Sequence, residues 1–247
     1  MADSALGKKN LFNSDTNVLG SIPDYAAMIQ YAVSSFTNTK DTDFSFRTVK
    51  TGKRFIVAIN RNILTFKNKE HQQIIFNALA SEELRMDQKL MVLFWQMVIN
   101  NDLFALITEN YYMKSVCAGR LSLHPEEIMS YLFELRRDYP NELTWKEATL
   151  KIIASKYLTI MKKLGLAEGT QTKEIKYPNI GDELFVILVR LALSVYPEKP
   201  TEKNPLFKYS FLDTASLISR MKSIKFTSYW SLTQLGNQII ITLNADE

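Results

Sequence analysis

Apolar residues recur at intervals of three or four along most of the chain, which is the spacing of one face of an α-helix. Phe55, Ile59 and Ile63 follow this pattern, with basic residues between them. The same spacing continues through three further stretches, at residues 71–80, 85–100 and 102–116. Neither Pro nor Gly interrupts residues 76–116. The pattern predicts a mainly α protein.

The middle of the chain carries start and stop signals for two successive helices. A Pro-Glu-Glu sequence at residues 125–127 is typical of a helix start, because Pro fits the first turn and acids favour the positive end of the helix dipole. Thr144 and Glu147 have the spacing of a capping box, which predicts a second helix beginning there. That helix is expected to end at Gly165, behind two lysines.

Two later segments have the alternation and turn residues of β-hairpins. One occupies residues 166–180, and the other flanks Leu235-Gly236-Asn237 near the C-terminus. These segments follow the order of a winged helix-turn-helix: a helix, a short connection, a capped helix, a glycine turn and a wing. In that motif the second helix enters the DNA major groove. We therefore predict a multi-helix, mainly α protein with winged-helix-like units and one or two small β-hairpins.

The same patterns divide the chain into three parts. Residues 1–20 are polar and without a clear period, so we expect a flexible N-terminus. Residues 21–118 are predicted to form an N-terminal helical domain that contains a basic helix, and residues 119–247 a C-terminal helical, winged-helix-like domain.

Composition supports a packed globular protein without membrane spans. Of the 247 residues, 46% are hydrophobic and 23% are charged. The most apolar runs, at residues 90–99 and 184–196, are shorter than the roughly 20 residues that a spanning helix needs. Cys117 is the only cysteine and is expected to be buried, and the N-terminus lacks the apolar run of a secretory signal. We therefore expect a cytoplasmic protein.

The sequence contains few residues suited to catalysis or metal binding. His71 and His124 are far apart and match no common zinc-binding spacing, and no glycine-rich phosphate loop is present. The acidic pairs at 82–83 and 126–127 are explained by helix starts. We predict no catalytic residue, no metal site and no cofactor, and so a protein that is not an enzyme.

The most informative charge pattern lies between residues 47 and 69, where there are basic side chains and no acid. Its basic members are Arg47, Lys50, Lys53, Arg54, Arg61, Lys67 and Lys69. Four of them fall at positions i, i+3, i+4 and i+11 of a helix and share one face: Lys50, Lys53, Arg54 and Arg61. The alternatives are an anion-binding surface and a solvated basic face, and the absence of acids favours the first.

A second basic region covers the predicted second helix of the winged unit and its wing. The apolar residues expected to face inward are Ala148, Ile152, Tyr157, Met161 and Leu164. The lysines expected on the outer side and in the wing are Lys151, Lys156, Lys162, Lys163, Lys173 and Lys176. Lys and Ser suit phosphate contacts, but Arg, Asn and Gln, the usual base readers, are missing from this helix. An ordinary amphipathic helix with a lysine-rich exterior remains the alternative.

Residues 20–170 resemble the BrxA family of bacterial BREX phage-defence systems. The resemblance rests on Ser45-Phe46-Arg47-Thr48, Lys53-Arg54 and the run from Ile59 to Leu64. It continues in Leu121-Ser122, Glu126-Glu127, Trp145, Thr149 and the run from Lys163 to Leu166. One departure is Asn62, which follows Arg61 where the family usually has Leu, with Ile63 next along the chain.

This resemblance implies an all-helical protein with winged-helix-like or NusB-like units that binds double-stranded DNA. It implies partners in a DNA methyltransferase, an ATPase and a phosphatase-like component. The contact residues that it carries over are Arg47, Lys50, Lys53, Arg54 and Arg61. We therefore expect a non-enzymatic double-stranded DNA-binding accessory protein of a phage-defence system. The alternatives are a protein-interaction scaffold of the defence complex and an RNA-binding helical module.

Overall fold

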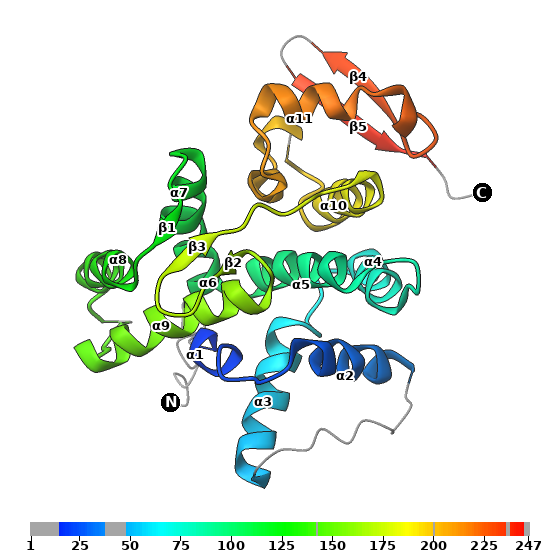
Figure 1. The fold of residues 1–247 in the computed structure, drawn as a ribbon. Coiled ribbons are helices and arrows are strands. Elements are labelled where there is room, and N and C mark those ends of the chain that lie inside the picture. Colours follow the sequence, from blue (N-terminus) through cyan, green and yellow to red (C-terminus); the bar gives the residue numbers. More distant parts are fainter. Residues whose placement is uncertain (1–14, 38–47, 142, 200, 236–237, 245–247) are drawn as a thin grey trace, which may run out of the picture.

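The fold is mainly helical, as predicted, with two small antiparallel sheets (Figure 1). The structure is a computed structural model, and it describes residues 15–37, 48–141, 143–199, 201–235 and 238–244. The α-helices are α1 (Thr16–Leu19), α2 (Tyr25–Thr37), α3 (Val49–Asn62), α4 (Lys69–Ala80), α5 (Met86–Asn100), α6 (Asp102–Ile107), α7 (Lys114–Cys117), α8 (Pro125–Asp138), α9 (Glu147–Lys163), α10 (Asp182–Val195) and α11 (Thr214–Met221).

Short turns and strands complete the fold. A π-helical turn, η1 (Thr108–Met113), joins α6 to α7, and the 3-10 turns are η2 (Thr201–Lys203), η3 (Pro205–Ser210) and η4 (Ile224–Phe226). The strands are β1 (Ser122–Leu123), β2 (Ala167–Glu168), β3 (Lys173–Ile175), β4 (Trp230–Leu235) and β5 (Gln238–Leu243). β4 and β5 form the predicted C-terminal hairpin.

Helix α5 lies at the centre of the core. All its side chains from Met91 to Met97 are buried, so this part of the helix is enclosed on every side rather than amphipathic, and Gln96 is its one polar member. The indole nitrogen of Trp95 donates to the carbonyl of Tyr209 at 3.1 Å, which ties α5 to η3. α10 packs against both α4 and η3. Among the described residues, no single helix is long and apolar enough to cross a membrane, and α5 with α6–α7 reaches that length only as a pair bent by 106°.

A buried polar cluster fixes the end of α3 against α4 and α5. The side-chain amide of Gln96 donates to the carbonyls of Ile63 (2.8 Å) and Thr65 (3.0 Å), and its oxygen lies 2.7 Å from Nε2 of His71. The amide of Lys67 donates to Nδ1 of His71 at 3.2 Å. Nδ1 is therefore the acceptor and Nε2 carries the proton of a neutral imidazole. Burial lowers the pKa of His71, consistent with the neutral form.

The predicted winged unit is present in the middle of the chain. β1, α8, α9, β2 and β3 follow one another, and the sheet has the order β1-β3-β2 with both pairs antiparallel (Figure 1). α8 and α9 pack against each other. Gly165 adopts φ +75° after α9, and the amide of Leu166 donates to the carbonyl of Met161 at 2.9 Å, so the chain turns there as predicted.

Three expectations are wrong. The flexible segment was expected at residues 1–20, of which 1–14 lie outside the described residues; residues 15–20 form α1 and a turn, and the Thr16 and Leu19 side chains are fully buried because α1 packs between other helices. Cys117 is exposed rather than buried, because it ends α7 at the surface. The predicted boundary at 118/119 does not separate two cores, since α1 packs on α9 and α4 on α10 across it.

Candidate nucleic-acid interface

Helix α9 begins two residues later than predicted, because its cap is Lys146 and not Thr144. Its first residue is Glu147, after Lys146 in an extended conformation, and Thr144 makes no capping hydrogen bond. The capping-box prediction is therefore wrong. The reason lies in α8, where Nη1 of Arg136 donates to the carbonyl of Trp145 at 2.7 Å and holds this segment outside the helix.

One strip of α9 faces solvent. Its exposed members are Glu147, Ala148, Lys151, Ile152, Ser155 and Lys162, at spacings of three, four and seven. Tyr157, Met161 and Leu164 are buried as expected, but Ala148 and Ile152 are not. The side chains that take their place in the core are Leu150, Ile153 and Ala154. Ile152 is 46% exposed, so the strip carries a large apolar side chain between its lysines.

Two of the predicted outward lysines lie under α1 instead. Lys156 packs against Gly20 at the end of α1, where a Cβ on Gly20 would come within 2.7 Å of the Lys156 Cβ. The ammonium of Lys163 donates to the carbonyls of Gly20 (3.1 Å) and Ile22, and lies 5.5 Å from the ring centre of Tyr25. Burial, and then the charge of Lys156, lower the pKa of Lys163. Both were predicted DNA contacts, and both are half-buried: the ammonium of Lys163 hydrogen-bonds within the protein, and the Cβ and backbone of Lys156 pack beside Gly20.

The wing contributes fewer free charges than predicted. Lys162 donates to the carbonyl of Gly169 at 2.8 Å, and Lys173 donates to the carbonyl of Thr170, so both ammonium groups brace the wing turn while remaining at its surface. Lys176 is exposed. Glu168 and Glu174 lie beside each other in the β2–β3 register and are also exposed. The wing therefore presents mixed charge rather than a basic patch.

The basic face of α3 agrees with prediction. Thr48 caps the helix by accepting from the amide of Thr51 at 3.2 Å, and Lys50, Lys53 and Arg54 are exposed and form no ion pair with any described residue. Arg61, on the same face, pairs with Asp15 at 3.2 Å. Arg47 lies outside the described residues. The N-terminal end of α3 projects from the body of the described molecule (Figure 1).

Helix α1 connects the two basic elements. It packs against both α9 and α3, and Figure 1 shows it beside the two helices. Asp15, just before α1, accepts from the side-chain amide of Asn62 at 3.1 Å as well as from Arg61. Thr16 donates to Asn101 at 3.2 Å. α1 therefore holds the basic helix α3 and the exposed strip of α9 in one fixed arrangement.

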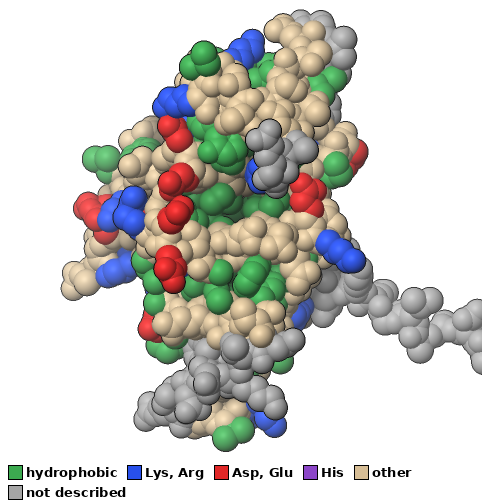
Figure 2. Space-filling model, turned by 90° about the vertical axis from the view of Figure 1, so that its right-hand side faces the viewer, with side chains coloured by type: hydrophobic (Ala, Val, Ile, Leu, Met, Phe, Trp, Pro, Cys, Tyr) green, Lys and Arg blue, Asp and Glu red, His purple; other side chains and the backbone are tan. Residues whose placement is uncertain are grey.

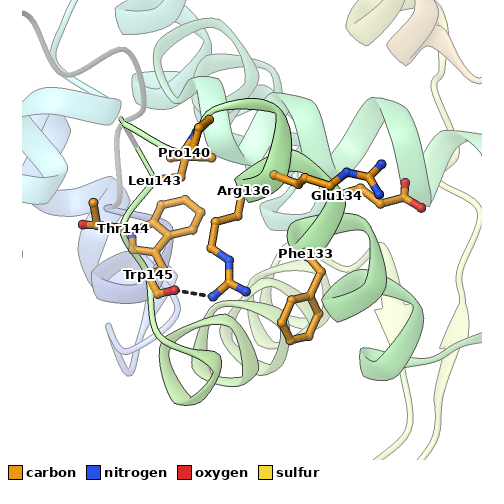
Figure 3. Close-up of a pocket in the computed structure, with 8 residues that line it drawn as sticks. Phe133, Glu134, Arg136, Pro140, Leu143, Thr144 and Trp145 are labelled. Atoms are coloured by element: carbon orange, nitrogen blue, oxygen red, sulfur yellow. Dashed lines mark hydrogen bonds between the residues drawn. The ribbon is translucent and has the colours of Figure 1, made fainter.

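The structure adds two arginines that the sequence analysis missed. Arg136 and Arg137 occupy the last turn of α8 and line a groove of about 680 Å³ between α8 and the α8–α9 connection. Figure 3 shows the side chain of Arg136 between Trp145 and Phe133, with its guanidinium carbon 5.0 Å from the Phe133 ring centre. The signal in the sequence was the Arg-Arg pair just before the predicted turn.

A different face of the molecule is acidic and apolar. Figure 2 shows Asp and Glu side chains gathered beside an apolar hollow. A groove of about 370 Å³ beside α4 and α10 is lined by Leu84, Val186, Ile187 and Tyr229, with Glu83, Glu183 and Arg190 also on its wall. Neither carboxylate forms an ion pair with a described residue. Two carboxylates against one arginine make this groove unfavourable for phosphate, so we do not include it in the candidate nucleic-acid interface.

No family model and no curated protein matches the sequence. A solved structure with a similar fold is the crystal structure of an uncharacterized protein from Magnetospirillum magneticum. It has a TM-score of 0.54 and 14% sequence identity, and the similarity covers 73% of this chain and 96% of that chain. At this identity the likeness shows the fold alone. Within the described residues, no three His, Cys, Asp or Glu side chains are placed to hold a metal ion.

Proposed function

We propose that the protein binds double-stranded DNA through the exposed strip of α9. The observation that supports this most is the winged helix-turn-helix order β1-α8-α9-β2-β3, in which α9 has the position of the recognition helix and keeps one side free. Lys151, Ile152 and Ser155 are exposed, so this side of α9 is free to enter a major groove.

The residues of the strip have complementary roles in this proposal. Lys151 and Lys162 neutralise phosphates, and the Ser155 hydroxyl hydrogen-bonds to a phosphate or a base edge. Ile152 contacts the groove floor, where thymine methyl groups offer apolar surface. α9 carries no Arg, Asn or Gln, so we expect weak sequence preference and an affinity that comes mainly from counterion release.

Helix α3 supplies a second phosphate contact in the proposal. Lys50, Lys53 and Arg54 point to solvent without acidic neighbours on the helix, which is the arrangement that attracts a polyanion. Because α1 fixes α3 relative to α9, the two surfaces can act on one duplex if its path passes both. A longer duplex would then bind more tightly than one that reaches α9 alone.

The resemblance to the BrxA family gives this activity a context. We propose that the protein is a non-enzymatic accessory component of a phage-defence system in the cytoplasm, acting beside a methyltransferase, an ATPase and a phosphatase-like protein. A component that holds DNA without sequence preference would increase the local concentration of substrate for such partners.

The test is fluorescence anisotropy of a labelled duplex of mixed sequence, from about 50 to 200 mM salt. We expect micromolar binding that weakens steeply with salt. Lys151→Ala should weaken it and reduce the salt slope by roughly one. Lys222→Ala, an exposed lysine after α11, is the matched control and should change nothing. Absence of binding at the lowest salt, or tighter binding to RNA of the same length, would reject the proposal.

A protein-interaction scaffold is the second candidate, and the acidic groove favours it. The apolar lining, where Glu83 and Glu183 outnumber Arg190, suits a partner protein that presents an apolar segment with a cation. Binding of the defence partners that is lost in Ile187→Glu, together with no DNA binding by the wild-type protein, would favour this candidate over the first.

A further inference from the structure

We propose that the groove between α8 and the α8–α9 connection is a binding site for a phosphate of the DNA backbone, with Arg136 and Arg137 as its donors. This inference rests on the proposed function and assigns a specific contact to it. The groove has a volume of about 680 Å³, and its lining includes Arg136, Arg137, Thr144 and Trp145 (Figure 3). This is large enough for a phosphate and the sugar next to it.

Arg136 is already held in place before any ligand arrives. One nitrogen of its guanidinium donates to the carbonyl of Trp145 at 2.7 Å, and the group lies over the ring of Phe133. A guanidinium has five N–H donors, so this arrangement leaves others for an acceptor in the groove. Since the side chain is fixed in advance, binding costs little additional conformational entropy.

Arg137 adds charge at the same opening. Its side chain is exposed and forms no ion pair with a described residue. Glu134 also lines the groove, and it forms no ion pair with either arginine. Among the described residues of the lining, two arginines therefore stand against one carboxylate. A forked guanidinium matches the geometry of two phosphate oxygens, which an ammonium group cannot do.

The position of the groove identifies the anion as DNA phosphate. Trp145 lies two residues before Glu147, where the exposed strip of α9 begins. In a winged helix-turn-helix with its second helix in the major groove, the connection between the two helices lies next to the DNA backbone. The apolar part of the lining, which includes Pro140 and Leu143, gives the deoxyribose a surface to pack on. An acidic protein segment has no comparable reason to align with α9.

The experiment measures duplex affinity and its salt dependence for Arg137→Ala and Arg136→Lys beside the wild-type protein, with Lys222→Ala as the control. We expect Arg137→Ala to weaken binding about tenfold and to lower the salt slope by roughly one. Arg136→Lys keeps the charge, so it should keep the salt slope but weaken binding because the fork is lost. A purely structural role for Arg137 would change the affinity of Arg137→Ala without changing its salt slope, so the slope of this variant is the deciding measurement.

The outcomes separate this inference from the proposed function. If the wild-type protein binds no duplex, both fail. If the wild-type protein binds and Lys151→Ala weakens it, while Arg137→Ala binds with wild-type affinity and slope, only the phosphate site is overturned, and the groove would then be available to an acidic protein segment. Arg137 is exposed and forms no hydrogen bond or ion pair with a described residue, so Arg137→Ala tests the site even if Arg136→Lys fails to fold.

Discussion

The ammonium nitrogen of Lys163 lies 3.1 Å from the carbonyl oxygen of Gly20, and the two residues are separated by most of the chain's first two thirds. The same ammonium also binds the carbonyl of Ile22. A lysine in the last turn of the candidate recognition helix thus anchors the segment after α1. The Lys163 ammonium donates to carbonyls inside the protein, so we do not expect it to contact a DNA phosphate.

Replacing Lys163 with Met should therefore cost stability and leave DNA affinity nearly unchanged. The thioether chain keeps the packing of the lysine stem but removes the donors to Gly20 and Ile22. We expect a loss of about 1–2 kcal/mol in the free energy of unfolding, measured by urea titration. The salt slope of DNA binding should match that of the wild-type protein. A reduced slope would show that Lys163 contacts phosphate after all.

A methyl group at Gly20 should displace α1 from α9. The added Cβ would lie 2.7 Å from both the Cβ and the carbonyl oxygen of Lys156, and the backbone oxygen has no room to move. We expect Gly20→Ala to lose about 1–3 kcal/mol, measured as a shift of the urea midpoint.

Gly181→Ala is the matched control for this change. Nothing lies within 4 Å of its Cβ position, and its φ of −63° suits alanine. Only the preference for a helix cap changes, so the loss should be about 0.5 kcal/mol. Equal losses in the two variants would contradict the packing of α1 on α9.

The free energy of unfolding should fall as the pH drops below about 6.5, the ordinary pKa of histidine. Burial lowers the pKa of His71 in the folded protein, so the unfolded chain binds a proton more readily in this range. Protonation of His71 at Nδ1 would also remove the acceptor of the hydrogen bond from the Lys67 amide. Urea midpoints at pH 7.5 and 5.5 should differ more in the wild-type protein than in His71→Gln. In His124→Gln, where an exposed imidazole is removed, the wild-type difference should persist.

The double variant Lys53→Ala/Arg54→Ala tests whether α3 and α9 share one duplex. On a long duplex we expect it to weaken binding and lower the salt slope by about two, one for each phosphate contact. On a duplex short enough to cover α9 alone the effect should disappear. An equal loss at both lengths would mean that α3 binds independently, whereas no loss at either length would exclude α3 from the interface.

Much of the fold was predictable because its signals are local. The spacing of apolar residues gave the helices, Gly165 gave the end of α9, and the turn residues gave the wing between β2 and β3. The basic face of α3 followed from helical geometry in the same way, since its exposed cations repeat at the expected positions.

What could not be predicted depends on contacts between distant segments. The contacts of Lys163 and Lys156 with the end of α1 require α1 to lie on α9, and the polar residues 15–20 give no sign of that packing. The late start of α9 likewise depends on Arg136 reaching the carbonyl of Trp145. Helix α9 packs with Leu150 and Ile153 inward, so Ile152 is exposed. The sequence could not decide this, because apolar residues on this helix are so frequent that their spacing fits more than one inward face.

The position of α1 also bears on how the chain reaches its final form during synthesis. Translation delivers Thr16 and Leu19 early, but α9, against which they pack, follows only after well over a hundred further residues have been made. Until α9 has been made, the Thr16 and Leu19 side chains of α1 have no complete packing surface. Contacts between segments so far apart in the sequence also form slowly. The N-terminal turn is therefore set in place late, after the helix that it covers, and remains open to chaperones or proteases in the nascent chain.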